Sequence, residues 1–183
     1  MKILAFAASN SSTSINKLLI EAATDLLKTE ILPGVEIKTL DLNDFEMPIY
    51  SPDREAAGGV PEKAHRFLAR IEAADALVIA FPEHNGNVPA AYKNLFDWAS
   101  RADKNVYQGK PMVIMAATPG PRAGAGVLGA VGHLAPFFGG EVRGSFGLGG
   151  FHESFDRETL FPVDPDKQAE FRKALSALAL ETA

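Results

Sequence analysis

Three short segments contain residue types that could bind an anion or a flat ring. The first runs from Ala8 to Asn16, is rich in hydroxyl and amide side chains, and carries no charge before Lys17. Backbone N–H groups at a helix start favour an anion and hydroxyls add donors, so a single phosphate monoester suits this loop. The loop lacks the Gly-x-Gly-x-x-Gly and Gly-Lys motifs of dinucleotide and triphosphate sites. An ordinary serine-rich turn that caps a helix explains the composition equally well.

The second segment, residues 81–89, reads Phe-Pro-Glu-His-Asn-Gly-Asn-Val-Pro and follows an apolar run. The prolines and the Asn-Gly pair restrict its backbone path, and Gly86 would let a flat ligand approach the chain closely. A tight turn alone also explains Asn-Gly. His84 in this loop and His152 further along are candidates for proton delivery, although a single histidine is more often a solvated residue.

The third segment, residues 118–126, reads Thr-Pro-Gly-Pro-Arg-Ala-Gly-Ala-Gly and could present backbone amides to a ring or a phosphate. Other reactive groupings have simpler explanations. Glu83 and Asp97 could suggest a carboxylate pair of the glycosidase kind, but a helix N-terminus or a solvated surface explains each one more simply. The four histidines show no ligand spacing, so we predict no metal site.

Five apolar runs predict the strands that position these loops. We expect buried strands at residues 3–7, 35–40, 76–81, 112–117 and 142–148. The third and fourth runs lack polar alternation, which is typical of parallel strands that are covered on both faces.

Helical spacing fills the gaps between these strands. We expect helices from Ser14 to Leu32, from Pro61 to Asp75, after Pro89, over 123–138 and from Asp164 toward the C-terminus. Residues 51–60 are predicted to be an exposed loop, and 147–163 form a long connection of the kind that is often functional. Repeated strand–helix alternation predicts one doubly wound α/β domain over residues 1–183, with ligands bound at the carboxyl ends of the strands.

The composition limits the class of protein. The chain has 183 residues, 46% of them hydrophobic, and a net charge of −5 without a basic patch that would favour nucleic acid as a partner. It contains no cysteine, which excludes disulfides, thiolate nucleophiles and cysteine metal sites. The N-terminal apolar run is too short for a signal peptide, and no run is long enough to cross a membrane. We therefore expect a cytoplasmic protein.

The order of these motifs along nearly the whole chain resembles the NADPH-dependent FMN reductase family, which includes flavin, quinone, azo and chromate reductases. The segment 82–86, followed by Pro89 and by residues 93–98, is similar to that family's flavin loop and the helix after it. Further similarity lies in the segments 47–53, 58–61, 73–76, 109–111, 118–120 and 152–156.

The resemblance implies a flavodoxin-like fold, with five parallel strands in the order 2-1-3-4-5 and helices on both faces. It implies bound FMN, NADH or NADPH as electron donor, and a small acceptor such as a quinone, azo compound, flavin or metal oxyanion. Relatives are usually homodimers or homotetramers. The residues implied to bind FMN are Ser9, Ser11, Ser14, Ile15 and Asn16 for its phosphate, and Pro82, Glu83, His84, Asn85, Gly86, Thr118, Pro119 and Gly120 for its ring.

Two departures from the family pattern leave other functions open. The family often has glycine where this chain has Ala8 and arginine where it has Ser11, so the phosphate would rest on neutral donors. A binding module that has lost FMN is one alternative. A flavodoxin-like electron carrier is another, although such carriers tend to be more acidic and to sandwich the flavin with aromatic side chains. Residues 82–86 contain no Phe, Tyr or Trp.

Overall fold

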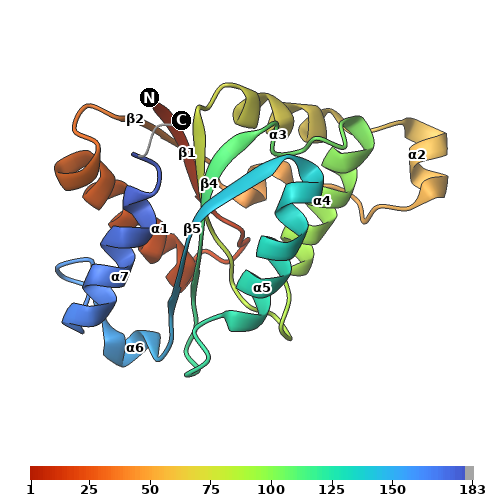
Figure 1. Cartoon of the computed structure of the whole chain (residues 1–183). Coiled ribbons are helices and arrows are strands. Elements are labelled where there is room, and N and C mark those ends of the chain that lie inside the picture. The colour runs from red at the N-terminus through yellow and green to blue at the C-terminus, as the bar shows by residue number, and fades with distance from the viewer. Residues whose placement is uncertain (180–183) are drawn as a thin grey trace.

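A five-stranded parallel sheet forms the centre of the computed structural model, which describes residues 1–179 (Figure 1). Its strands are β1 (Lys2–Ala7), β2 (Glu36–Thr39), β3 (Ala76–Ala80), β4 (Lys110–Ala117) and β5 (Gly140–Leu148). They lie in the order β2-β1-β3-β4-β5, and each neighbouring pair is parallel. The predicted flavodoxin-like, doubly wound sheet is therefore confirmed.

Helices cover both faces of the sheet and close two cores (Figure 1). One face carries α1 (Ile15–Leu26), the π-helical turn that continues it (Leu27–Ile31) and α7 (Pro165–Ser176). The other face carries α3 (Glu62–Glu72), α4 (Ala90–Ala102) and α5 (Ala125–Leu134). Along β3, Val78 packs in the core beneath α1 and α7, whereas Leu77 and Ile79 pack in the core beneath α3, α4 and α5. Because neither face of β3 meets water, this strand requires an uninterrupted apolar run.

The sequence predicts a buried strand over residues 35–40. A strand is present there, but the prediction that it is buried is wrong. The strand β2 is shorter and largely exposed, because it lies at the edge of the sheet and pairs only with β1. Glu36 and Lys38 project from it and form an ion pair at 3.2 Å. An edge strand needs few apolar residues, and its charges discourage pairing with other chains.

The prediction of an exposed loop over 51–60 is also wrong, because this segment contains helix α2 (Pro52–Gly58). The Ser51 side chain accepts a hydrogen bond from the N–H of Arg54, and Pro52 fits the first helical turn. No residue of α2 is buried, and the helix projects away from the sheet (Figure 1). The helix therefore lacks the apolar periodicity that marks the others, and only its terminal signals could have revealed it.

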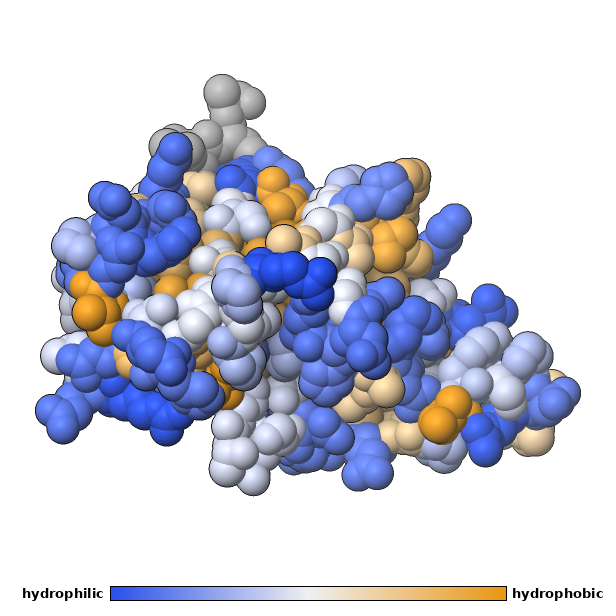
Figure 2. Space-filling view, turned by 90° about the horizontal axis from the view of Figure 1, so that it is seen from below, coloured by the Kyte–Doolittle hydropathy of each residue, from blue (hydrophilic) through white to orange (hydrophobic). Residues whose placement is uncertain are grey.

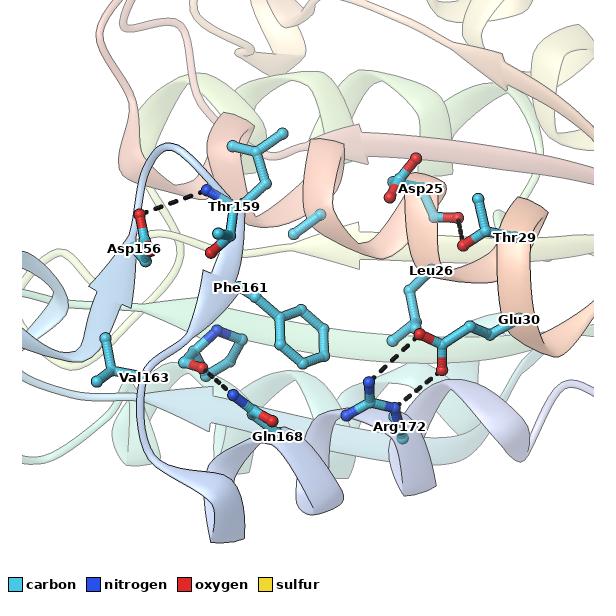
Figure 3. A pocket seen from close by; sticks show the side chains of 13 residues that line it. Asp25, Leu26, Thr29, Glu30, Asp156, Thr159, Phe161, Val163, Gln168 and Arg172 are labelled. Atoms are coloured by element: carbon cyan, nitrogen blue, oxygen red, sulfur yellow. Dashed lines mark hydrogen bonds and ion pairs between the residues drawn. The ribbon is translucent and has the colours of Figure 1, made fainter.

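The long connection over 147–163 folds into small elements of its own. They are α6 (Phe151–Ser154) and an antiparallel hairpin of β6 (Phe155–Asp156) and β7 (Phe161–Pro162). A pocket of about 510 Å³ lies between this hairpin, α1 and α7 (Figure 3). There the guanidinium of Arg172 bonds Glu30 at 3.0 Å and lies 4.6 Å from the centre of the Phe161 ring. No residue predicted to bind FMN lines this pocket.

The predicted helix over 123–138 is divided into two parts. α5 ends at Leu134, and the chain continues as a 3-10 helix, Ala135–Phe138, whose first turn contains Pro136. Within residues 1–179, no helix combines the length and the apolar character that a bilayer span requires.

Candidate functional site

The loops that follow β1, β3 and β4 leave the sheet side by side, because these strands are neighbours and run in parallel. The N–H of Ala8 donates to Ala80 O at 2.8 Å, and the N–H of Phe81 donates to Met115 O at 2.7 Å, so backbone pairing continues past the strand ends. Figure 2 looks onto this face, where pale residues of intermediate hydropathy lie beside strongly hydrophilic ones. The structure thus brings the three predicted segments to one edge of the sheet.

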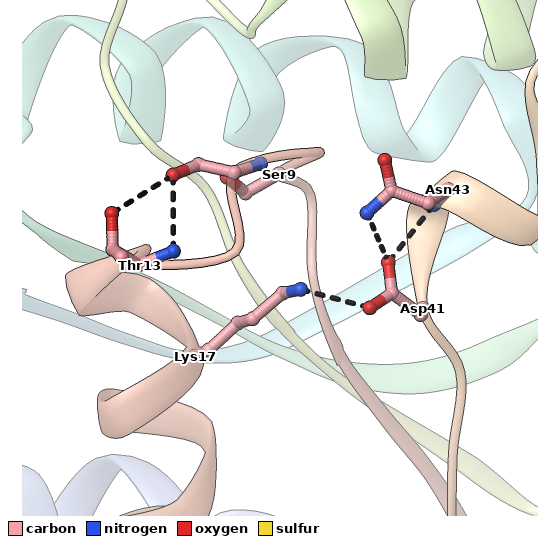
Figure 4. A network of polar contacts seen from close by, with 6 residues as sticks. Ser9, Thr13, Lys17, Asp41 and Asn43 are labelled. Atoms are coloured by element: carbon pink, nitrogen blue, oxygen red, sulfur yellow. Dashed lines mark hydrogen bonds and ion pairs between the residues drawn. The ribbon is translucent and has the colours of Figure 1, made fainter.

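Hydroxyl groups shape the loop after β1 (Figure 4). The buried Ser9 accepts a hydrogen bond on Oγ from the N–H of Ser11 at 3.2 Å. Ser11 Oγ in turn accepts one from the N–H of Thr13 at 3.3 Å. Serine and threonine commonly form such local bonds in turns. They fix the path of this loop without any charged side chain.

Three donors at the start of α1 have no partner within residues 1–179. Ser14 is the N-cap residue, yet its hydroxyl does not cap the helix, and the N–H groups of Ile15 and Asn16 meet no protein acceptor. The first turn of α1 also carries no acidic side chain. A phosphate here would satisfy these donors and meet the positive end of the helix dipole. The residues present therefore fit the predicted phosphate group.

Asn16 ties two of the loops together. Its buried side chain donates from Nδ2 to Ala117 O at 2.9 Å and accepts on Oδ1 from the N–H of Ala117 at 2.8 Å. Because Ala117 ends β4, this amide connects the start of α1 with the loop after β4, past the end of the intervening β3. The side chain of Asn16 is thus used within the protein, and its backbone N–H remains for a ligand.

Lys17, the first charged residue after the loop, is engaged as well (Figure 4). Its Nζ lies 2.9 Å from Asp41 Oδ2, and Asp41 also accepts hydrogen bonds from the backbone and side-chain amides of Asn43. The hydrogen bond from Lys17, followed by that from the Asn43 N–H, holds the pKa of Asp41 below its ordinary value. Lys17 therefore joins α1 to the 3-10 helix Leu42–Phe45, which Asp41 caps.

Residues 82–87 contain a tight turn. The N–H of His84 donates to Asn87 O at 2.9 Å, and the N–H of Asn87 donates back to His84 O at 3.1 Å. Between them, Asn85 and Gly86 have φ values of +53° and +77°, as a type I′ turn requires. A Cβ on Gly86 would meet no protein atom within 4 Å. The backbone at Gly86 is therefore open to a flat group.

The carboxylates of Glu83 and Asp97 have different partners. The Glu83 side chain is only 10% exposed, accepts a hydrogen bond from the N–H of Val127 at 3.1 Å, and lies 3.6 Å from the Arg122 guanidinium. Asp97 pairs with Lys93 at 2.6 Å on α4. Each carboxylate thus has a structural partner, which agrees with the simpler of the two interpretations. The carboxylate of Glu83 is therefore bound to the start of α5. The backbone of Glu83 still belongs to the segment 82–86 that is predicted to contact the ring.

The loop after β4 is supported by the start of the long connection. The N–H of Thr118 donates to Leu148 O at 2.9 Å, and the N–H of Gly150 donates to Gly120 O at 3.1 Å. A Cβ on Gly149 would lie 2.9 Å from Gly120 O, so this close approach needs glycine. Our sequence prediction missed this support, although the Gly149-Gly150 pair was a signal for it.

The two candidate proton donors lie on different segments. His84 is exposed in the turn after β3, and His152 is exposed on α6, where its Nδ1 lies 3.4 Å from a nitrogen of Arg157. Neither histidine has a carboxylate partner within residues 1–179. In the part of the chain that the structure describes, no three potential metal ligands are grouped around a common point.

The sheet order and the loops at its carboxyl edge define a flavodoxin-like fold with a hydroxyl-rich loop after its first strand. The chain belongs to the NADPH-dependent FMN reductase family, whose sequence pattern matches residues 1–152.

Two curated relatives illustrate the similarity in sequence. An NAD(P)H-dependent FMN reductase of Pseudomonas aeruginosa is 36% identical over 120 residues, which make up 66% of this chain and 61% of that protein. An NADPH:quinone oxidoreductase of Arabidopsis thaliana is 36% identical over 115 residues, which make up 63% of this chain and 57% of that protein. The chain thus spans about 60% of the length of these relatives.

Solved structures share the fold at lower sequence identity. The flavoenzyme FerB, an NAD(P)H:acceptor oxidoreductase of Paracoccus denitrificans, aligns with a TM-score of 0.74 at 22% identity, over 97% of this chain and 94% of FerB. An FMN-dependent NADH-azoreductase of Bacillus anthracis, solved with FMN, aligns with a TM-score of 0.70 at 19% identity, over 98% of this chain and 100% of that chain.

Proposed function

We propose that the protein is an FMN-dependent NAD(P)H oxidoreductase that passes electrons from a nicotinamide nucleotide through FMN to a small acceptor. The observation that carries this proposal is the set of donors at the start of α1, those of Ser14, Ile15 and Asn16, that have no partner in the described part of the chain. They lie at the same edge of the sheet as the open turn at Gly86. A phosphate group and a flat ring are the parts of FMN that these two features suit.

The same residues that the sequence singled out would hold the cofactor. The phosphate would be bound by hydroxyl and backbone donors of Ser9, Ser11, Ser14, Ile15 and Asn16, and the ring would lie against residues 82–86 and 118–120. When bound, FMN supplies the redox chemistry, since it can accept a hydride and pass the electrons on.

The part of the protein in this reaction is to hold the reactants in place. The turn at Asn85-Gly86 and the loop at 118–120 are fixed by backbone hydrogen bonds, so they need little reorganisation when ligands bind. Backbone N–H groups of these loops can also stabilise charge on a bound ring. Such a reaction does not require a side-chain acid or base, and the exposed His84 and His152 are proposed only as proton donors to the acceptor.

A cavity of about 480 Å³ offers space for the acceptor or the nucleotide beside the loop after β1. Asn10 of that loop, residues 42–50 and the start of α4 form its walls. The walls combine apolar side chains with amides and with the charged side chains of Glu46, Lys93 and Asp97, and small-molecule sites commonly join an apolar lining to a few polar groups. We propose that the acceptor is a planar or small oxidant, namely a quinone, an azo compound, a flavin or a metal oxyanion.

The test is an anaerobic titration of the purified chain. FMN fluorescence should be quenched at micromolar FMN, and NADH or NADPH should then bleach the flavin absorbance before an acceptor restores it. Absence of binding would identify a module that has lost FMN. Binding without bleaching by either nucleotide would identify an electron carrier instead.

We propose further that the protein acts in the cytoplasm and that it forms a homodimer or homotetramer. Leu134 and Phe137 are 51% and 67% exposed beside an apolar groove between α4 and α5. Trp98 of α4 is buried in the domain's own core and does not line this groove, whereas the largely buried Tyr92 lies at its base. Light scattering should show an oligomer that the Phe137→Ser variant weakens, and a monomeric wild-type chain would contradict this proposal.

A further inference from the structure

Helix α5 begins at a residue that cannot cap it. Its N-cap residue is Gly124, which has φ of +73° and no side chain. A Cβ at this position would lie 2.3 Å from the Cβ of Ala116, so a capping serine or aspartate cannot replace it. The free N–H groups in the first turn of α5 must therefore find acceptors elsewhere in the protein.

Glu83 supplies one of these acceptors from a distant loop. Its Oε2 accepts the N–H of Val127, a residue 44 positions further along the chain, at 3.1 Å. The carboxylate is 10% exposed and also faces Arg122 at 3.6 Å. The positive end of a helix dipole favours a carboxylate in this position. Glu83 thus acts as a long-range cap for α5.

Gly126 lets the start of α5 approach the turn after β3. A Cβ on Gly126 would lie 3.0 Å from Gly86 O and 3.1 Å from Gly86 Cα, and it would also lie 3.1 Å from Glu83 Oε2. Only a residue without a side chain allows this approach without moving the turn. One contact therefore joins the turn at Gly86 to the helix that follows the loop over 118–124.

We propose that Glu83 and Gly126 are positioning residues that set the distance between the two loops, 82–86 and 118–120, against which the flavin ring would lie. The inference rests on the proposed function, because it takes both loops as parts of the FMN site. It assigns the Glu83 carboxylate to the protein framework rather than to the flavin. Displacement of α5 by a few tenths of an ångström would then change the affinity for FMN.

The sharpest test compares two alanine substitutions in the same helix. Gly126 and Gly129 are both exposed in α5, but a Cβ on Gly129 would meet nothing within 4 Å. Both changes should favour the helix, because alanine restricts the unfolded chain more than glycine does. Gly126→Ala should nevertheless weaken FMN binding by about fivefold or more, since small displacements of positioning groups are amplified. Gly129→Ala should leave the affinity within about twofold of wild type.

Substitutions of Glu83 test the other half of the contact. Glu83→Ala removes the acceptor and should weaken FMN binding about tenfold, whereas Glu83→Gln keeps a side-chain carbonyl for the Val127 N–H and should recover most of that loss. Glu30→Ala, which breaks a surface ion pair with Arg172, is the control and should leave FMN affinity unchanged. Fluorescence quenching measures all of these affinities, and thermal unfolding in the absence of FMN measures stability.

Equal FMN affinities for Gly126→Ala and Gly129→Ala would overturn the inference, even if Glu83→Ala does not fold. So would a Glu83→Gln variant that binds FMN as weakly as a folded Glu83→Ala variant. Failure of the proposed function gives a different result, because the wild-type chain itself would then bind no FMN or would not be reduced. In that case, faster hydrogen exchange of the Val127 amide in Glu83→Ala still reports whether the contact holds α5.

Discussion

The side-chain amide of Asn16 forms two hydrogen bonds with the backbone of a single residue, Ala117, at the end of β4. Asn16→Ala would leave the N–H of Ala117 without a partner in a buried position. We expect a loss of about 2–4 kcal/mol in the free energy of unfolding, since both bonds are lost and a buried donor is left unsatisfied. Urea denaturation measures this loss. The exposed Asn43 is the control, and Asn43→Ala should cost less than about 0.5 kcal/mol.

Alanine substitutions at Gly86 and at Gly59 distinguish the cost of backbone strain from an effect on FMN binding. Both have positive φ, +77° and +71°, and a Cβ on either would meet no protein atom within 4 Å. Alanine should therefore destabilise the fold by about 1 kcal/mol at Gly86 and by about 1–3 kcal/mol at Gly59, because the ψ of Gly59, −170°, lies in a region that residues with a side chain rarely adopt. Only Gly86→Ala should weaken FMN binding, because Gly59 lies at the end of α2. If both variants bind FMN like the wild type, the ring does not lie against Gly86.

Residue types could be predicted at the site, but their partners could not. The hydroxyl-rich loop, the Asn85-Gly86 turn and the Gly120 loop were found because local composition signals them. The pairs Asn16–Ala117 and Glu83–Val127 join residues 101 and 44 positions apart, and their contacts exist only after the sheet forms. This is why the sequence suggested cofactor contacts for side chains that in the structure are bound to backbone groups.

At the scale of elements, the ion pair of Lys17 and Asp41 joins α1 to the segment after β2. The pKa of Asp41 is lowered by Lys17 and then by Asn43. The pair therefore stabilises the fold above the ordinary pKa of 3.8, and this contribution is lost as the pH falls through the lower folded value. Because both side chains are partly exposed, we expect Asp41→Asn to cost only about 0.5 kcal/mol at pH 7.

Urea unfolding of wild type and Asp41→Asn at a series of pH values measures this contribution. The difference in the free energy of unfolding between wild type and Asp41→Asn should shrink as the pH falls toward and below the folded pKa of Asp41. It should also shrink in high salt, because exposed charges are screened. A difference that is the same at neutral and acid pH would show that the asparagine perturbs packing rather than charge.

The elements that sequence reasoning found are those whose burial leaves a pattern. β3 and β4 are covered on both faces and read as continuous apolar runs, so they were located closely. The edge strand β2 and helix α2 contain no buried residue, so hydrophobic periodicity says little about them. The signals for α2 were the Ser51 cap and Pro52, which composition alone presents as a loop.

At the scale of the whole molecule, the core between the sheet and α3–α5 contains two buried tyrosines whose hydroxyls lie 2.8 Å apart. Burial raises the pKa of Tyr107 to about 12 and raises that of Tyr92 well above its ordinary value. In the unfolded chain both would ionise near pH 10. Their neutral forms therefore stabilise the fold below pH 10, and this stabilisation is lost as the pH rises toward the folded values.

We expect unfolding at alkaline pH to be governed by this pair. Above pH 10, each tyrosine should lower the free energy of unfolding by up to about 1.4 kcal/mol per pH unit. Phenolate absorbance and circular dichroism, followed together, should show both tyrosines ionising as the helices are lost. The double variant Tyr92→Phe/Tyr107→Phe removes both hydroxyls, leaves neither unpaired, and should unfold at higher pH. Ionisation of all tyrosines near pH 10 with the circular dichroism unchanged would show that this core admits water.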